Sequence, residues 1–128
     1  MPFTEIELAY LQAQPLGRLA TLRPDGTLQN SPVGFRVDAA AGTIDIPGYG
    51  MSSSRKYRNV AANGQVALVV DDVPSVDPWR VRCVEIRGTA EAIGEIIRIR
   101  PRRIISFGLD QPDADAHRLV VNGRDVTS

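Results

Sequence analysis

The stretch SSSRKYRNVAANG, residues 52–64, decides how the rest of the chain is interpreted, because it places one short helix within a run of strands. Ser53 or Ser54 suits the N-cap of this helix, and Asn63 with Gly64 suits its end. Apolar residues recur at the three- and four-residue spacing of a buried helical face: Tyr57, Val60 and Ala61. A single helix between strands is not the repeated alternation of a doubly wound sheet.

The segments around this stretch have the features of β-strands joined by tight turns. We expect strands over residues 17–22, 28–38, 42–47, 66–72, 81–92 and 95–108, the last broken near Pro101. The continuous apolar run VALVVDD predicts burial on both faces, and the two prolines of residues 73–79 predict a loop. A helix over residues 4–13 starts with a Thr4–Glu7 capping box. The prediction is a mainly β protein, a small barrel of about six antiparallel strands with two short helices.

The composition describes one globular domain, spanning residues 1–128. Lys plus Arg number 15 and Asp plus Glu number 15, so there is no basic surface for general nucleic-acid binding. No apolar run is long enough to cross a membrane, and the first residues lack the order of a signal peptide. With one cysteine, Cys83, the sequence predicts a cytoplasmic protein. The tail after residue 110 is polar, and we expect a loose end or one last short strand there.

Residues that perform chemistry themselves are few in this chain. The only histidine, His117, lies in the polar tail, which argues against a catalytic triad or a metal cluster. Cys83 lies within a strand and is more consistent with packing than with nucleophilic attack. Asp71 and Asp72 precede the proline loop, where solvated carboxylates are the simpler interpretation. The sequence therefore names no catalytic residue and no metal ligand.

The start of the 52–64 helix favours an anion instead. Its serine hydroxyls and free N–H groups are donors, and Arg55, Lys56 and Arg58 add positive charge. Cations at a helix N-terminus oppose the helix dipole by about 0.3–1 kcal/mol, a penalty that a bound anion would reverse. The alternative is a solvated surface helix. Two interpretations remain for the other arginines: they meet in one groove, or they form structural ion pairs with acidic residues. These arginines are Arg36, Arg80, Arg82, Arg102 and Arg103.

The order of these segments resembles the pyridoxamine 5′-phosphate oxidase-like split β-barrel superfamily. The chain looks most like small actinobacterial flavin/deazaflavin oxidoreductases that use coenzyme F420. The segments that carry the resemblance are LGRLATLRPDGTLQNSPVGF, GTIDI, SSRKYRNVAANGQVALVVDD, VDPWRVRCVEIRGTAEA and EIIRIRPRRIISFGLD. The S-RK-x-x-N-x-x-x-N helix and the V-x-I-x-G-x-A-E strand are the most specific of them.

The resemblance implies a homodimer with a cofactor in a groove between subunits. It implies that the cofactor ring lies along Asn30, Ser31, Pro32 and Val33. It implies that the segment from Ile46 and Pro47 to Ser54 lines the ribityl side. Arg55 and Lys56 match the positions that hold the phosphate, and Arg58 suits the anionic tail of F420. The resemblance also implies that the partner subunit contributes contacts to the cofactor through the strand with Arg80 and Arg82 and through the segment ending at Phe107.

The implied activity is hydride transfer between F420 and a small organic molecule, with an FMN-binding flavoprotein as the alternative. A protein that binds the cofactor without turnover is a third possibility. The chain lacks the C-terminal substrate motif of the B6 oxidase proper, which argues against that activity. Cys83 and Phe107 stand where the near family often has Gly and Trp, and the link between Ala92 and Ile96 is short. These changes leave the shape of the ring pocket undetermined.

Overall fold

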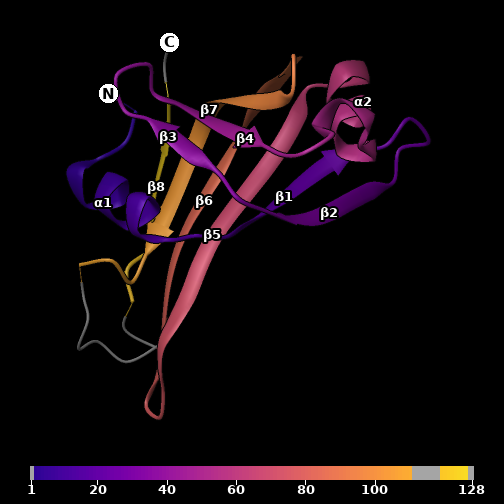
Figure 1. Cartoon of the computed structure of the whole chain (residues 1–128). Coiled ribbons are helices and arrows are strands. Elements are labelled where there is room, and N and C mark those ends of the chain that lie inside the picture. The colour runs from indigo at the N-terminus through magenta and orange to yellow at the C-terminus, as the bar shows by residue number, and fades with distance from the viewer. Residues whose placement is uncertain (1, 111–118, 127–128) are drawn as a thin grey trace.

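The computed structural model describes residues 2–110 and 119–126, and their strands form one antiparallel sheet (Figure 1). The strands within these residues are β1 Gly17–Leu22, β2 Leu28–Val33, β3 Arg36–Asp38, β4 Thr43–Pro47, β5 Gln65–Val76, β6 Trp79–Ile93, β7 Ile96–Phe107 and β8 Asn122–Asp125. The mainly β, antiparallel prediction is confirmed. The expectation of about six strands is too low, because one expected strand is divided and the tail adds β8.

The sheet curls back on itself. Its strand order is β2-β1-β5-β6-β7-β4-β3, with β8 paired to β7. β2 and β3 lie at opposite ends of this order, yet only Gly34 and Phe35 separate them along the chain. The two edges must therefore approach each other, which makes the sheet a barrel open between β2 and β3. The single strand expected over 28–38 is wrong for this reason: the chain passes there from one edge to the other.

The barrel interior is filled by aliphatic side chains with no exposed surface: Ile44, Ile46, Leu68, Val70, Val84, Ile86, Ile97, Ile99 and Ile104. On β5, Val66, Leu68 and Val70 point into this core, while Ala67 and Val69 remain half-buried. Burial of VALVVDD on both faces is therefore not observed. The outer face of β5 stays open, and this face carries the pocket described below.

Residues 73–79, expected to be a loop, belong mostly to strands. β5 and β6 continue past the barrel as a hairpin arm, the lowest part of the molecule in Figure 1. The pairing shifts register between Asp72 and Ser75, so Pro74, which has no N–H, lies in an irregularity of the ladder. The arm exposes apolar side chains: Val73, Val76 and Trp79.

A second irregularity lies between β6 and β7. Arg87 pairs with Arg103 and Gly88 with Pro101, so Arg102 is an extra residue on β7. A Cβ at Gly88 would lie 2.2 Å from the carbonyl oxygen of Arg100, which only glycine tolerates. The strand expected to break at Pro101 is therefore continuous, and the proline lies in a β-bulge.

The first helix, α1 Glu5–Ala13, begins as expected with the reciprocal capping box of Thr4 and Glu7. Its buried residues are Glu7, Tyr10 and Leu11, and Glu7 is 2% exposed whereas the apolar Ile6 is 45% exposed. Glu7 binds Arg124 of β8 and the hydroxyl of Ser106, and these partners explain a buried carboxylate.

The central helix, α2 Arg55–Ala62, follows the short 3-10 turn η1 Met51–Ser53 and ends at Asn63 as predicted. Its buried residues are Asn59 and Val60, and Ala61 is exposed. The last short strand of the tail is β8, and the expectation for His117 lies outside the described residues. Neither helix of the described chain is long and apolar enough to cross a membrane.

Candidate functional site

The serines before α2 are engaged within the chain. The Ser54 hydroxyl accepts a hydrogen bond from the Tyr57 backbone N–H at 3.2 Å and donates to the Met51 carbonyl oxygen at 2.7 Å. The Ser52 backbone N–H donates to the Glu95 carboxylate at 3.1 Å, and its hydroxyl donates there as well. These bonds lower the pKa of Glu95. The expectation that the serines offer free donors to a ligand is wrong for Ser52 and Ser54, which build the entry to the helix.

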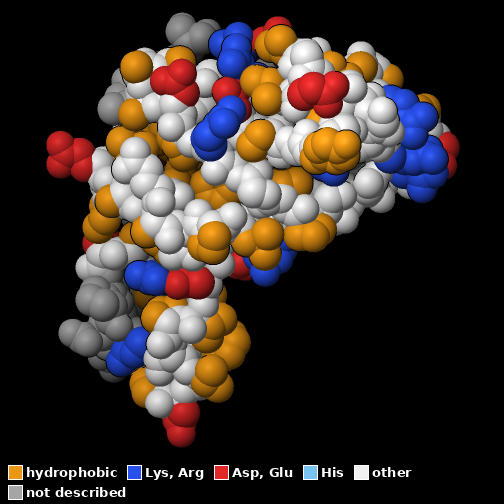
Figure 2. Space-filling model, viewed as in Figure 1, with side chains coloured by type: hydrophobic (Ala, Val, Ile, Leu, Met, Phe, Trp, Pro, Cys, Tyr) orange, Lys and Arg blue, Asp and Glu red, His pale blue; other side chains and the backbone are white. Residues whose placement is uncertain are grey.

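In contrast to these engaged serines, the cations of α2 have no charged partner among the described residues. Among the described residues, Arg55, Lys56 and Arg58 form no ion pair. Seven other arginines each contact a carboxylate: Arg18, Arg82, Arg87, Arg98, Arg100, Arg103 and Arg124. Figure 2 shows basic side chains gathered at the end of the molecule where Figure 1 places α2. The three cations at the start of α2 therefore have no ion-pair partner among the described residues.

Asn59 fixes α2 to the sheet. Its side-chain N–H groups donate to the Thr21 hydroxyl on β1 and to the Gln29 side-chain oxygen on β2, each at 3.1 Å. Gln29 in turn donates to the Ser31 hydroxyl at 3.3 Å. Asn59 is 2% exposed, so these bonds are shielded from water. Sequence reasoning gave Asn59 no role. A polar residue next to Val60 on the buried face of the helix could have indicated a structural hydrogen bond.

The predicted ring-side residues alternate along β2. Asn30 and Pro32 are exposed, Ser31 is half-buried beside Gln29, and Val33 is buried in the core. On β4, Ile46 has no exposed surface and Pro47 is half-buried. The side chains of Val33 and Ile46 therefore face the barrel interior, and a ligand at the surface would meet only their backbone.

The residues expected to contact the partner's cofactor lie away from α2. Arg80 and Arg82 are at the base of the arm, and Phe107 pairs with Cys83 at the same end of the sheet. The Arg82 guanidinium binds Asp72 at 2.9 Å and lies 5.2 Å from the centre of the Tyr10 ring. Arg82 therefore has a structural ion pair.

Tyr10 closes this cluster, because its hydroxyl donates to Asp72 at 2.8 Å. Hydrogen bonds from Arg82 and Tyr10 hold the pKa of Asp72 below its ordinary value. Burial and the bond to Asp72 raise the pKa of Tyr10. Asp71 and Asp72 lie on β5 in contact with Arg18 and Arg82, so the solvated-loop interpretation of this pair is wrong.

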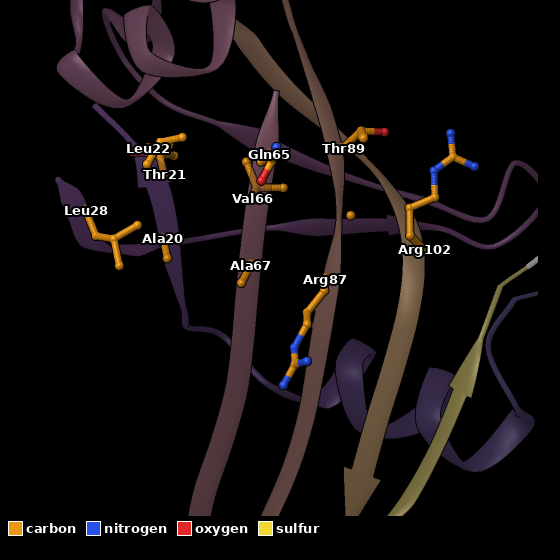
Figure 3. A pocket seen from close by; sticks show the side chains of 11 residues that line it. Ala20, Thr21, Leu22, Leu28, Gln65, Val66, Ala67, Arg87, Thr89 and Arg102 are labelled. Carbon is orange, nitrogen blue, oxygen red and sulfur yellow. The ribbon is translucent and has the colours of Figure 1, made fainter. Parts of the chain in front are cut away.

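A pocket of about 430 Å³ lies on the outer face of the sheet, beside α2 (Figure 3). It is lined by Ala20, Thr21, Leu22, Leu28, Gln65, Val66, Ala67, Arg87, Gly88, Thr89 and Arg102. Thr21 joins this pocket to the helix, since it accepts the bond from Asn59. None of the residues predicted to bind the cofactor lines it. Of the arginines expected to meet in a groove, Arg102 lies here, whereas Arg82 and Arg103 are held by Asp72 and Asp125.

Groups for covalent or metal chemistry are scarce in the described part of the chain. Cys83 is buried, as its predicted packing role requires, and burial raises the pKa of its thiol to about 11. The thiol is therefore protonated at neutral pH and is a poor nucleophile. Residues 2–110 and 119–126 contain no cluster of His, Cys, Asp and Glu that could hold a metal ion.

Comparison with known proteins agrees with the β-barrel fold. The pyridoxamine 5′-phosphate oxidase family matches residues 3–120, and the chain belongs to this family. It is 46% identical, over its whole length and 96% of the relative, to the 5a,11a-dehydrotetracycline/5a,11a-dehydrooxytetracycline reductase of Streptomyces rimosus. With a reductase as a relative across its full length, the protein is an oxidoreductase of this family.

Solved structures show the same fold. An F420 reductase is 26% identical with a TM-score of 0.58, covering 73% of this chain and 90% of that one. The conserved hypothetical protein Rv2991 of Mycobacterium tuberculosis is 18% identical with a TM-score of 0.71, over 98% of this chain and 93% of its own. The likeness to Rv2991 concerns the fold alone.

Proposed function

We propose that this protein is an F420-dependent reductase that transfers hydride to a conjugated double bond of a polycyclic organic molecule. The observation that carries the proposal is the set of α2 cations without carboxylate partners, Arg55, Lys56 and Arg58. The dehydrotetracycline reductase supports the substrate class, and the F420 reductase supports the cofactor.

The residues present fit a phosphate-bearing cofactor with an acidic tail. Arg55 and Arg58 are exposed and three residues apart, so they lie on one face of the helix, and Lys56 is adjacent. The fork of arginine binds phosphate oxygens in pairs, and lysine adds a point charge. Asn59 holds this helix against β1 and β2, which positions the cations relative to Ser31. Arg58 is one turn beyond Arg55, at a position suited to the tail.

Bound F420 supplies the hydride chemistry of a deazaflavin. The role of the protein is to bind and orient the cofactor and the substrate and to exclude water from them. Arg55 and Lys56 would hold the phosphate. Asn30 and Pro32 expose their side chains on the strand along which the cofactor ring is expected to lie. Solvent would supply the proton. The net reaction adds one hydride and one proton across the double bond and leaves the cofactor oxidised.

Fluorescence titration with F420 tests the cofactor. We expect saturable binding that weakens at least about tenfold in Lys56→Ala, because a charge-assisted contact is lost. Arg18→Ala is the matched control, since Arg18 is an exposed cation paired with Asp71 and lies outside α2. Binding of FMN but not of F420 would overturn the deazaflavin assignment while keeping the phosphate site. Equal binding by the wild type and Lys56→Ala would overturn the phosphate site itself.

Turnover needs its own assay. Oxidation of reduced F420 is followed with a panel of conjugated polycyclic ketones, including 5a,11a-dehydrotetracycline, and we expect at least one to be consumed. Binding without turnover of any member would identify a protein that carries the cofactor rather than a reductase.

We also propose that the functional form is a homodimer in the cytoplasm. The exposed apolar side chains of the arm, Val76 and Trp79, favour burial against another protein surface. Sedimentation velocity checks this proposal, with twice the chain mass as the expected result and the mass of one chain as the contrary one.

A further inference from the structure

The pocket on the outer sheet face combines an apolar floor with two arginines at its edge. Ala20, Leu22 and Leu28 lie on one side, and Ala67 of β5 lies in the middle (Figure 3). Arg87 and Arg102, from β6 and β7, stand on the other side. Its volume of about 430 Å³ is within the range of small-molecule sites, roughly 300–1,000 Å³.

The bulge between β6 and β7 places Arg102 at the edge of this pocket. Arg102 is the extra residue of the bulge, and its carbonyl oxygen accepts a hydrogen bond from Val126 at 2.7 Å, which fixes the backbone. Bulges redirect side chains and are frequent beside active sites. Gly88 makes the bulge possible, because a Cβ there would strike β7.

Arg102 differs from its neighbours on β7 in its ion pairing. Arg102 is exposed and forms no ion pair with the described residues, whereas its neighbours Arg100 and Arg103 bind Glu91 and Asp125. Arg87 is already paired with Glu85. One arginine without an ion-pair partner at the edge of an apolar pocket is complementary to an apolar anion.

We propose that this pocket binds the hydride acceptor, a planar polycyclic molecule with an ionised oxygen that pairs with Arg102. The assignment of the ligand as the acceptor rests on the proposed function, whereas the site itself does not. Thr21, which lines the pocket and accepts the bond from Asn59, connects it to the helix proposed to hold the cofactor.

Two dyes with the same ring system test the site without cofactor or substrate. The anionic probe is 8-anilinonaphthalene-1-sulfonate, and the neutral probe is N-phenyl-1-naphthylamine. We expect Arg102→Gln to weaken the anionic dye about tenfold or more and to leave the neutral dye unchanged. Arg100→Gln, on the same strand but outside the pocket, should change neither.

A filling variant tests the floor. Ala67→Phe should abolish binding of both dyes, whereas Val69→Phe, two residues along the same outer face and outside the pocket, should retain it. Sedimentation is measured on both variants. If Ala67→Phe converts a dimer to a monomer and no dye binds the wild type, the face is an interface between copies and the proposal is overturned. Equal dye binding by Ala67→Phe and the wild type overturns it as well.

Kinetics then decide whether the ligand is the acceptor. With an acceptor that the wild type reduces, Arg102→Gln should raise the acceptor KM about tenfold and leave the F420 affinity unchanged. An unchanged KM together with weakened dye binding would overturn the acceptor assignment. Failure of the wild type to bind F420 would instead contradict the proposed function, so the two failures are distinct.

Discussion

The two α-helices of the described chain differ in whether the charged side chains around them form ion pairs. At α1, Glu7 contacts Arg124 at 2.6 Å, and Tyr10, Asp72 and Arg82 form a closed cluster nearby. At the start of α2, three cations have no carboxylate partner among the described residues. The chain as a whole is neutral, with 15 residues of each sign. Net charge therefore says little about function here. The pairing of individual side chains distinguishes the paired end of the molecule, at α1, from the proposed binding end, at α2.

The largest expected effect is at the paired end. Glu7→Gln keeps the size of the side chain but removes the charge that faces Arg124 and Ser106. We expect a loss of about 3 kcal/mol in the free energy of unfolding, the lower end for a broken buried ion pair. The lower end applies because 35% of the Arg124 side chain is exposed. Urea denaturation measures this loss. Exposed Glu5→Gln is the control, and an equal effect of both would contradict the comparison.

Acid should weaken the paired end without replacing a residue. Burial acts to raise the pKa of Glu7, but the bonds from Arg124, Thr4 and Ser106 outweigh it, so this pKa lies below its ordinary value. Stability from Glu7 is therefore complete above the unfolded value of about 4.5 and is lost as pH falls through the lower folded value. Thermal melts from about pH 6 to about pH 3 should show this loss, with a shallower decline in Glu7→Gln.

Asn59 connects the binding end to the sheet, and its removal should have an intermediate effect. Asn59→Ala leaves Thr21 and Gln29 without a buried partner, which costs about 2 kcal/mol of unfolding free energy. Asn63→Ala breaks one exposed bond, to the Gln65 backbone N–H, and should cost less than about 1 kcal/mol. Chemical denaturation of both variants measures the difference. Similar losses would show that the buried bonds do not anchor α2.

The smallest effect belongs to the unpaired cations and has the opposite sign. Lys56→Ala removes a positive charge from a helix start, and stability should rise by about 0.3 kcal/mol without ligand. Arg18→Ala removes an exposed pair with Asp71 and should lower stability by less than about 1 kcal/mol. Thermal melts at low ionic strength compare the two. A clear destabilisation by Lys56→Ala would indicate an internal partner and contradict the contrast.

Local patterns predicted the helices and most strands correctly. The Thr4–Glu7 capping box and the Ser54 cap follow from neighbouring residues, so sequence was sufficient to place them. It failed where a distant segment decides the outcome. Pro74 and Pro101 read as chain breakers, but each lies at a shift of pairing register that only the partner strand reveals.

The candidate site was predicted only in part for the same reason. The cluster of Arg55, Lys56 and Arg58 is visible in the sequence, but the absence of partners for it depends on the positions of all carboxylates. Arg102 could not be distinguished from Arg100 or Arg103 without the bulge that separates their directions. The role of Asn59 likewise depends on Thr21 and Gln29, which lie 38 and 30 residues away along the chain.

The arm contains the only tryptophan of the chain, Trp79, with 52% of its surface exposed. Tryptophan fluorescence of the native protein, excited selectively over the tyrosines, therefore reports from one place, separate from α2 and from the pocket on the sheet. Its emission would shift to the blue when the arm is covered and would stay red while the arm is in water. The molecule thus carries its own optical reporter of arm contacts, which needs no label and leaves every residue of both proposed sites unchanged.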